Sequence, residues 1–206
     1  NFVWAIKLSN TTKINSTLLD ASGNIYSAGS YFSQSSSYQI YLNKIDPLGN
    51  LTWSKTYGGL DFDEANAMAL DVSGNIYITG YFRGTTDLDP NAGVYNLTST
   101  GNDEIFVSKL DGSGNFIWAK QMGGFDNDFS VSIVVDGTGN SYTVGNFNGT
   151  ADFDPGPRIY KLNTTSFSLN LLVTKLDRDG SFIVPKQFSG DVQSCYSATL
   201  ENQGYI

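Results

Sequence analysis

The stretch "LDVSGNIYITGYFRGTTDLDP" at residues 70–90 returns, with few changes, as "VDGTGNSYTVGNFNGTADFDPGP" at residues 135–157. The two copies begin 65 residues apart and keep the same order of glycines, aromatic residues and aspartates. Self-similarity at a fixed period of this length indicates a repeat protein. One structural unit is therefore expected to recur along the chain.

Two turn motifs alternate in this repeat, and each places a glycine among aspartate and asparagine residues. Copies of the first motif stand at residues 20–24, 71–75 and 136–140, with a degraded fourth copy at 201–204, and copies of the second at 46–50, 111–115 and 177–180. Glycine adopts a positive φ at no steric cost, and Asp and Asn side chains bond the turn backbone. These motifs predict hairpin connections.

Four runs rich in β-branched and aromatic residues flank the turns of one unit: "AMALD", "IYITGYF", "EIFVSKLD" and "FIWAKQ". Such runs predict four strands per unit. Ile76 and Ile78 should face one side of the sheet and Tyr77 the other, so both faces are expected to be covered. Four-stranded antiparallel sheets stacked around an axis meet this demand, and the predicted fold is an all-β β-propeller. A β-solenoid is the alternative, although its rungs repeat every twenty or so residues.

The repeat predicts a partial β-propeller over residues 1–206. We expect the end of one blade and the first strand of the next in 1–19, blade repeats in 20–70, 71–135 and 136–200, and the start of a further repeat in 201–206. About three blades are thus present, whereas a closed ring needs about 4 to 8. The chain is expected to be part of a larger protein, or to be completed by another chain.

Composition excludes several classes of function. The net charge is -8 and the few basic residues are scattered, which argues against nucleic acid and anionic membranes as partners. No run approaches the ~18 apolar residues of a membrane span, so membrane insertion is not expected. The chain has no His and one Cys, Cys195, which excludes Ser-His and Cys-His catalysis and zinc sites built on His or Cys.

Residues 74–124 resemble the bacterial β-propeller repeat family that is often called the seven-bladed β-propeller repeat. The matching features are Gly-Asn-x-Tyr-x-x-Gly-x-Phe, Gly-Thr-x-Asp-x-Asp-Pro, Phe-Val-x-Lys-Leu-Asp, and Trp-Ala-Lys-Gln followed by Gly-Gly. The third unit departs from the pattern, since Val184-Pro185 stands in place of Trp118-Ala119. The resemblance implies a secreted or surface-exposed, large and multidomain bacterial protein, exported in some bacteria by a type IX system.

The Asp-x-Asp-Pro loop occurs in two units and is missing from the first, so it is an insertion that a blade does not require. It places carboxylates on alternate residues, namely Asp87 with Asp89 and Asp152 with Asp154. Paired carboxylates on an extended backbone suit a hard cation, and a calcium site is the metal hypothesis here. The alternative is that each Asp caps the loop backbone while Pro90 or Pro155 stiffens the turn.

Tryptophan and lysine recur at fixed places in the unit. The tryptophans are Trp4, Trp53 and Trp118, and the lysines are Lys44, Lys109 and Lys175. A recurring Trp is expected to pack between blades, with a sugar-binding face as the alternative. The lysines are expected to be solvated or paired with Asp at blade edges.

These features favour a non-catalytic extracellular or cell-surface module for adhesion, binding or structural display. Its expected partners are other domains of the same large protein, other surface proteins or glycans. The alternative is a carbohydrate-active enzyme or a lectin that uses Asp and Trp residues of the propeller face. An enzyme should carry acids unique to one blade. The nearest candidates are Asp61, Asp63 and Glu64 in "GGLDFDEAN", but this loop is similar to "GGFDNDFS" of the next unit, so no catalytic residue is assigned.

Overall fold

The computed structural model describes residues 5, 12–33, 37–164, 170–188 and 196–199. Every regular element in these ranges is a β-strand, and none of them holds a helix that could cross a bilayer. The strands are β1 (Thr12–Leu19), β2 (Ile25–Phe32), β3 (Tyr38–Ile45), β4 (Leu51–Tyr57), β5 (Glu64–Leu70), β6 (Ile76–Phe82), β7 (Thr85–Asp87), β8 (Asn96–Thr98), β9 (Glu104–Leu110), β10 (Phe116–Gly124), β11 (Phe129–Val135), β12 (Ser141–Phe147), β13 (Thr150–Asp152), β14 (Lys161–Asn163), β15 (Asn170–Leu176) and β16 (Phe182–Phe188). The expected all-β fold is confirmed.

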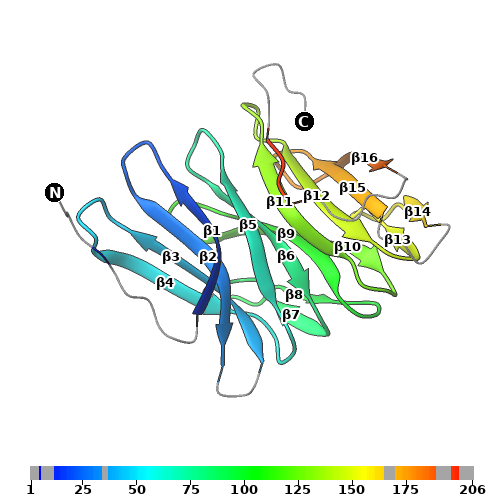
Figure 1. Cartoon of the computed structure of the whole chain (residues 1–206), viewed down its shortest axis with the longest axis horizontal. Coiled ribbons are helices and arrows are strands. Elements are labelled where there is room, and N and C mark those ends of the chain that lie inside the picture. Colours follow the sequence, from blue (N-terminus) through cyan, green and yellow to red (C-terminus); the bar gives the residue numbers. More distant parts are fainter. Residues whose placement is uncertain (1–4, 6–11, 34–36, 165–169, 189–195, 200–206) are drawn as a thin grey trace.

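Three antiparallel blades of four strands follow one another along the chain and lie side by side in Figure 1. The first blade has the strand order β1-β2-β3-β4, the second β5-β6-β9-β10 and the third β11-β12-β15-β16. Strand β5 contacts β1 on one side and β11 on the other, so the first strands of the blades are neighbours. This arrangement confirms a partial β-propeller.

The hairpin turns owe their shape to one aspartate side chain each. Asp71 Oδ1 accepts the backbone N–H groups of Ser73 and Asn75 at 2.9 Å each, and Gly74 takes a φ of +79°. Asp20, Asp46, Asp111 and Asp136 cap their turns with the same two bonds. The recurring turn aspartates are therefore structural.

The second blade is covered on both faces, as its strand pattern predicts. Ile76 and Ile78 of β6 lie in a core shared with the first blade, whereas Tyr77 lies in a core shared with the third. Strand β9 divides in the same way, with Phe106 in the first core and Val107 in the second. Burial of apolar surface between blades is the main source of stability for such a stack.

Two short hairpins, β7–β8 and β13–β14, are inserted between the second and third strands of their blades. In the first blade β2 and β3 pair up to Phe32 and Tyr38, and the described residues between these strands hold no such hairpin. Strand β13 pairs instead with β10 of the preceding blade, where Ala151 lies opposite Gly124 and Asp152 opposite Gly123. The insertion from one blade thus extends the sheet of its neighbour to the order β14-β13-β10-β9-β6-β5.

The blades span residues 12–57, 64–124 and 129–188, so each first strand precedes the turn motif of its unit. Beyond the third blade, the Ala198 N–H donates to Ser132 Oγ of β11 at 3.1 Å. The Met68 N–H of β5 makes the same bond to Ser16 Oγ of β1. Residues 196–199 thus lie beside β11 in the position that β5 takes beside β1. Trp4, Cys195 and the motif at 201–204 lie outside the described residues.

Candidate functional site

Each inserted hairpin contacts a Gly-Gly pair at the end of the outer strand of the preceding blade. Gly124 lies so close to the Thr150 carbonyl, and Gly59 to the Thr85 carbonyl, that neither position has room for a Cβ atom. Close approach of two backbones is one of the uses of glycine. The repeated Gly-Gly is therefore the contact point for the hairpin of the next unit.

At each of these two contacts a buried aspartate forms hydrogen bonds to the glycine pair and to residues of the next unit. Asp128 Oδ2 accepts the Gly124 N–H at 2.7 Å, and its Oδ1 accepts the Asn148 N–H at 3.1 Å. Asp63 is fully buried in the same way and accepts the Gly59 N–H at 2.5 Å and the Thr86 hydroxyl at 2.6 Å. Each carboxylate thus joins an outer strand to residues of the next unit.

Both of these carboxyls titrate above their ordinary range. Burial raises the pKa of Asp63 to about 6, although the bonds from Thr86 and Gly59 oppose the shift. Burial raises the pKa of Asp128 to about 7, and the nearby carboxylate of Glu104 adds to the shift. The cause is the cost of holding a charge away from water.

The aspartates predicted to bind calcium bond the backbone of their own loops. Asp87 Oδ1 accepts the N–H groups of Asp89 and Tyr95 at 3.0 and 2.8 Å. Asp89 Oδ1 accepts the Asn91 N–H at 2.9 Å. These bonds match the capping alternative stated for the loop.

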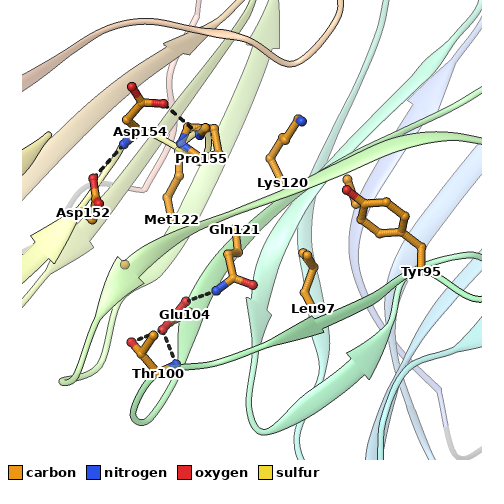
Figure 2. A pocket seen from close by; sticks show the side chains of 13 residues that line it. Tyr95, Leu97, Thr100, Glu104, Lys120, Gln121, Met122, Asp152, Asp154 and Pro155 are labelled. Carbon is orange, nitrogen blue, oxygen red and sulfur yellow. Dashed lines mark hydrogen bonds between the residues drawn. The ribbon is translucent and has the colours of Figure 1, made fainter. Parts of the chain in front are cut away.

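The second loop repeats the arrangement. Asp152 Oδ1 accepts the N–H groups of Asp154 and Tyr160 at 3.1 and 2.8 Å. Asp154 Oδ1 accepts the Gly156 N–H at 2.8 Å. In Figure 2 the two carboxylates lie one after the other along the loop, each bonded to the backbone ahead of it.

The residue between each pair of aspartates anchors the loop. Leu88 and Phe153 are both completely buried, the former in the core of the first and second blades and the latter in that of the second and third. Sequence reasoning missed this role, although an apolar residue between two acids signals it. No group of three or more His, Cys, Asp or Glu side chains comes together within the described ranges, and the calcium site stays a prediction.

A groove of about 400 Å³ opens along the outer strand of the second blade (Figure 2). The consecutive run 119–123 of β10 lines it, together with residues of the two hairpins, of the loop after β8 and of the start of β9. These other lining residues are Tyr95, Leu97, Thr100, Glu104, Asp152, Asp154, Pro155 and Gly156. A strand lines a cavity with consecutive residues only along its edge, since side chains on one face alternate. The groove therefore follows the edge of β10 at residues 119–122, which precede the pairing of Gly123 and Gly124 with β13.

Glu104 is a buried acid at the bottom of this groove. Its Oε1 accepts the Thr100 N–H at 2.6 Å, and its Oε2 accepts the Gln121 side-chain N–H at 3.1 Å. The strand registers place Gln39 and Asn170 at the equivalent positions of the other blades. Glu104 is therefore particular to the second blade, and the sequence analysis did not single it out.

Lys120 lies in the middle of the groove and differs from its counterpart in the first blade. There Lys55 Nζ donates to Asn91 Oδ1 at 2.7 Å, and Asn91 Nδ2 donates to the Gly114 carbonyl at 3.3 Å. In the second loop Gly156 occupies the position of Asn91. Without that bridging amide, Lys120 makes no hydrogen bond or ion pair within the described residues.

A second hollow of about 580 Å³ adjoins the first and shares Lys120, Asp154 and Gly156 with it. Its other lining residues are Pro157, Arg158, Ile159, Tyr160, Gly180, Ser181, Phe182 and Ile183. The Asp154–Gly156 segment thus runs between two hollows that meet at Lys120. Neither Lys120 nor the loop substitution was singled out from the sequence, although the exchange of Asn91 for Gly156 between repeats was the available signal.

The recurring tryptophans lie between blades. Trp118 is buried in the core of the second and third blades, and its Nε1 donates to the Arg178 carbonyl at 3.2 Å. Trp53 is half-buried and packs against the core of the first and second blades. Inter-blade packing is confirmed for both residues.

The recurring lysines also cross between blades. Lys109 is buried, lies 3.7 Å from Asp71, and donates to the Arg178 carbonyl of the third blade at 3.2 Å. Lys44 reaches the Gly112 carbonyl of the second blade at 3.3 Å. The expectation that the lysine is solvated or paired with Asp is confirmed for Lys109 by its pair with Asp71, and its side chain is enclosed between two blades.

No family model matches the chain. An uncharacterized WD repeat-containing protein of Acanthamoeba polyphaga mimivirus is 30% identical over 115 residues, which are 49% of this chain and 8% of that protein. The chain thus spans less than a tenth of the length of this relative. The likeness agrees with a β-propeller type of repeat, and the narrower resemblance to the bacterial repeat family stays a prediction.

Proposed function

We propose that this chain is a non-catalytic β-propeller module that binds a partner in the groove around Lys120. The observation that carries the proposal is the break in the repeat at Gly156, which leaves the Lys120 ammonium without a bonding partner among the described residues, in a hollow of ligand size. Residues that recur in every repeat are accounted for by the packing of the blades. A residue that differs between repeats at an exposed surface, such as Gly156, is not accounted for by packing. The relative's WD repeats support a binding role, since propellers present such surfaces on rigid blades.

The acids near the groove support the absence of catalysis. Glycoside hydrolysis needs two carboxyl groups facing the scissile bond. Glu104 is bonded by Thr100 and Gln121, and Asp152 and Asp154 each bond the backbone of their own loop. Carboxylates held in this way serve the fold.

We further propose that the module belongs to a larger protein that is secreted or displayed at the cell surface. Its bacterial family resemblance and its scarcity of charged residues, 16%, support this setting. Partners would then be other domains of that protein, other surface proteins or glycans.

Two measurements test the proposal. The purified chain is incubated with a panel of polysaccharides while reducing ends and unsaturated sugars are followed, and we expect no product above the buffer blank. Intact cells of the source organism are treated with protease, and we expect the module to be released or degraded. Product formation that is lost in a Glu104→Gln variant would establish an enzyme, and complete protection in intact cells would contradict surface display.

A further inference from the structure

We infer that the groove around Lys120 binds an oligosaccharide. This inference rests on the binding role proposed above and adds the chemical class of the ligand. Three features of the groove lead to it: its opening between repeats, its fixed aromatic rings, and its mixture of hydrogen-bond donors and acceptors.

The opening is specific to one junction between blades. At the first junction, Asn91 fills the space between Lys55 and the Gly114 carbonyl with two hydrogen bonds. At the second, Gly156 has no side chain to do so, and the hollows on either side of the loop meet at Lys120. The result is an elongated polar surface, which suits a chain-like ligand.

An aromatic ring stands in each hollow. Tyr95 packs against Phe116 with ring centroids 4.8 Å apart, and Tyr160 packs against Phe182 with centroids 5.4 Å apart. Tyr95 lines the first hollow and Tyr160 the second. Rings held by a neighbour offer an apolar face at little entropic cost, and the C–H faces of sugar rings are suited to such surfaces.

The polar groups that line the two hollows include both hydrogen-bond donors and hydrogen-bond acceptors. Lys120 and Arg158 are donors, and the Oδ2 of Asp154 is an acceptor to which no bond is made in the described part. Gln121 donates its amide to Thr98 and Glu104, which fixes its carbonyl oxygen as a further acceptor. Hydroxyl groups donate and accept, so a sugar satisfies such a set, whereas a polyanion would meet Asp152 and Asp154.

A peptide is the competing occupant, because the β10 edge that faces away from β9 has no strand partner among the described residues before Gly123 and could accept an added strand. Lys120 on that edge opposes strand addition, since charged residues on edge strands discourage pairing. A peptide added as a strand would bind through backbone hydrogen bonds alone and would leave the aromatic rings and the side-chain acceptors of the groove without contacts. The groove therefore favours a sugar.

The test uses the whole chain and four probes: a printed array of plant, microbial and animal glycans, and then calorimetry with cellohexaose, mannohexaose and hexagalacturonate. We expect array binding and a measurable affinity for cellohexaose or mannohexaose, and none for the polyanionic hexagalacturonate, whose carboxylates would face Asp152 and Asp154. Lys120→Ala should weaken that affinity about tenfold, the usual scale for one charge-assisted hydrogen bond. Lys55→Ala is the matched control and should leave it unchanged, because Lys55 is bonded to Asn91 in a closed junction.

Gly156→Asn restores the side chain of the first junction and should abolish binding. Its Cβ would lie 2.9 Å from Asp154 Oδ1, the end of a side chain that can shift, so the melting temperature should change little. Asn91 shows that this loop geometry accepts asparagine, since its N–H bonds Asp89 as the Gly156 N–H bonds Asp154. No glycan binding, or binding that survives both Lys120→Ala and Gly156→Asn, would overturn the inference. Binding of peptides from a library at the groove would also overturn the sugar inference, but it would agree with the binding role proposed above. Cleavage of a bound sugar would instead refute only the non-catalytic role.

Discussion

Asp63 and Asp128 reveal how single residues set the response of this molecule to pH. Their pKa values rise from 3.8 to about 6 and about 7 because burial disfavours the charged form. A carboxyl with a higher pKa in the folded state binds its proton more tightly there than in the unfolded chain. Its contribution to stability is therefore fully present below about pH 3.8 and is lost as the pH rises through 6 and 7.

We expect the free energy of unfolding to fall by a few kcal/mol between about pH 4.5 and pH 8, since each pKa unit corresponds to about 1.4 kcal/mol. Urea unfolding across this range measures the change. Asp128→Asn, which keeps an acceptor oxygen for the Gly124 N–H but cannot ionise, should remove about half of the slope. An unchanged slope in Asp128→Asn and Asp63→Asn would show that neither acid is its source.

Asp136 responds in the opposite direction and supplies the control. Burial opposes the shift, but bonds from Thr138 and Asn140 outweigh it and hold the pKa of Asp136 below its usual value. Its contribution is thus present above pH 3.8 and is lost only as the pH falls through the lower folded value. We expect Asp136→Asn to leave the slope between pH 4.5 and pH 8 unaltered and to change stability only in stronger acid.

Asp87 separates the two roles stated for the Asp-x-Asp-Pro loop. Because its Oδ1 receives two backbone N–H groups, we expect Asp87→Ala to cost about 1–3 kcal/mol whether or not calcium is present. Thermal unfolding of the wild type and the variant, each with calcium and with a chelator, makes the comparison. A calcium-dependent rise in the wild-type melting temperature that the variant lacks would establish the predicted cation site.

At the scale of elements, the inserted hairpins act between blades. The contact of Gly124 with the Thr150 carbonyl leaves no room for a methyl group, so Gly124→Ala must push β13 away from β10. We expect a loss of more than about 2 kcal/mol and faster proteolysis within residues 150–163. Gly137→Ala, where an added Cβ meets nothing within 4 Å, is the control and should change stability little. Equal effects of the two variants would rule out the clash as the cause.

The sequence predicted the strands and turns of these elements because their signals are local. Gly74 and Asp71 specify a hairpin turn by their own conformations and bonds, and Ile76 and Tyr77 alternate within one strand. The pairing of β13 with β10 was not predicted, since it joins residues of neighbouring blades whose adjacency no local pattern encodes. Whether an Asp oxygen bonds backbone or cation likewise depends on how the loop folds back at Tyr95.

For the whole molecule, the candidate site arises from a difference between equivalent positions of two blade junctions. Lys55 and Lys120 occur in the same sequence context, and only the partner Asn91 or its replacement Gly156 distinguishes them. Those partners lie 36 residues from their lysines along the chain. A repeat therefore predicts the architecture from the features that recur, and its function from those that fail to recur.

The blades are also joined by a lysine that bridges one blade to a turn of the next, and this device yields the last prediction. Lys109 lies 4.7 Å from the Tyr77 ring and donates to the Arg178 carbonyl, whereas Lys175 lies over Tyr142 at 4.6 Å with no such acceptor among the described residues. We expect Lys109→Met, which keeps most of the apolar stem, to cost about 2 kcal/mol in chemical denaturation. Lys175→Met should cost under about 1 kcal/mol in this chain. Equal costs would mean that the cation–aromatic contact, and not the bond to the next blade, carries the energy.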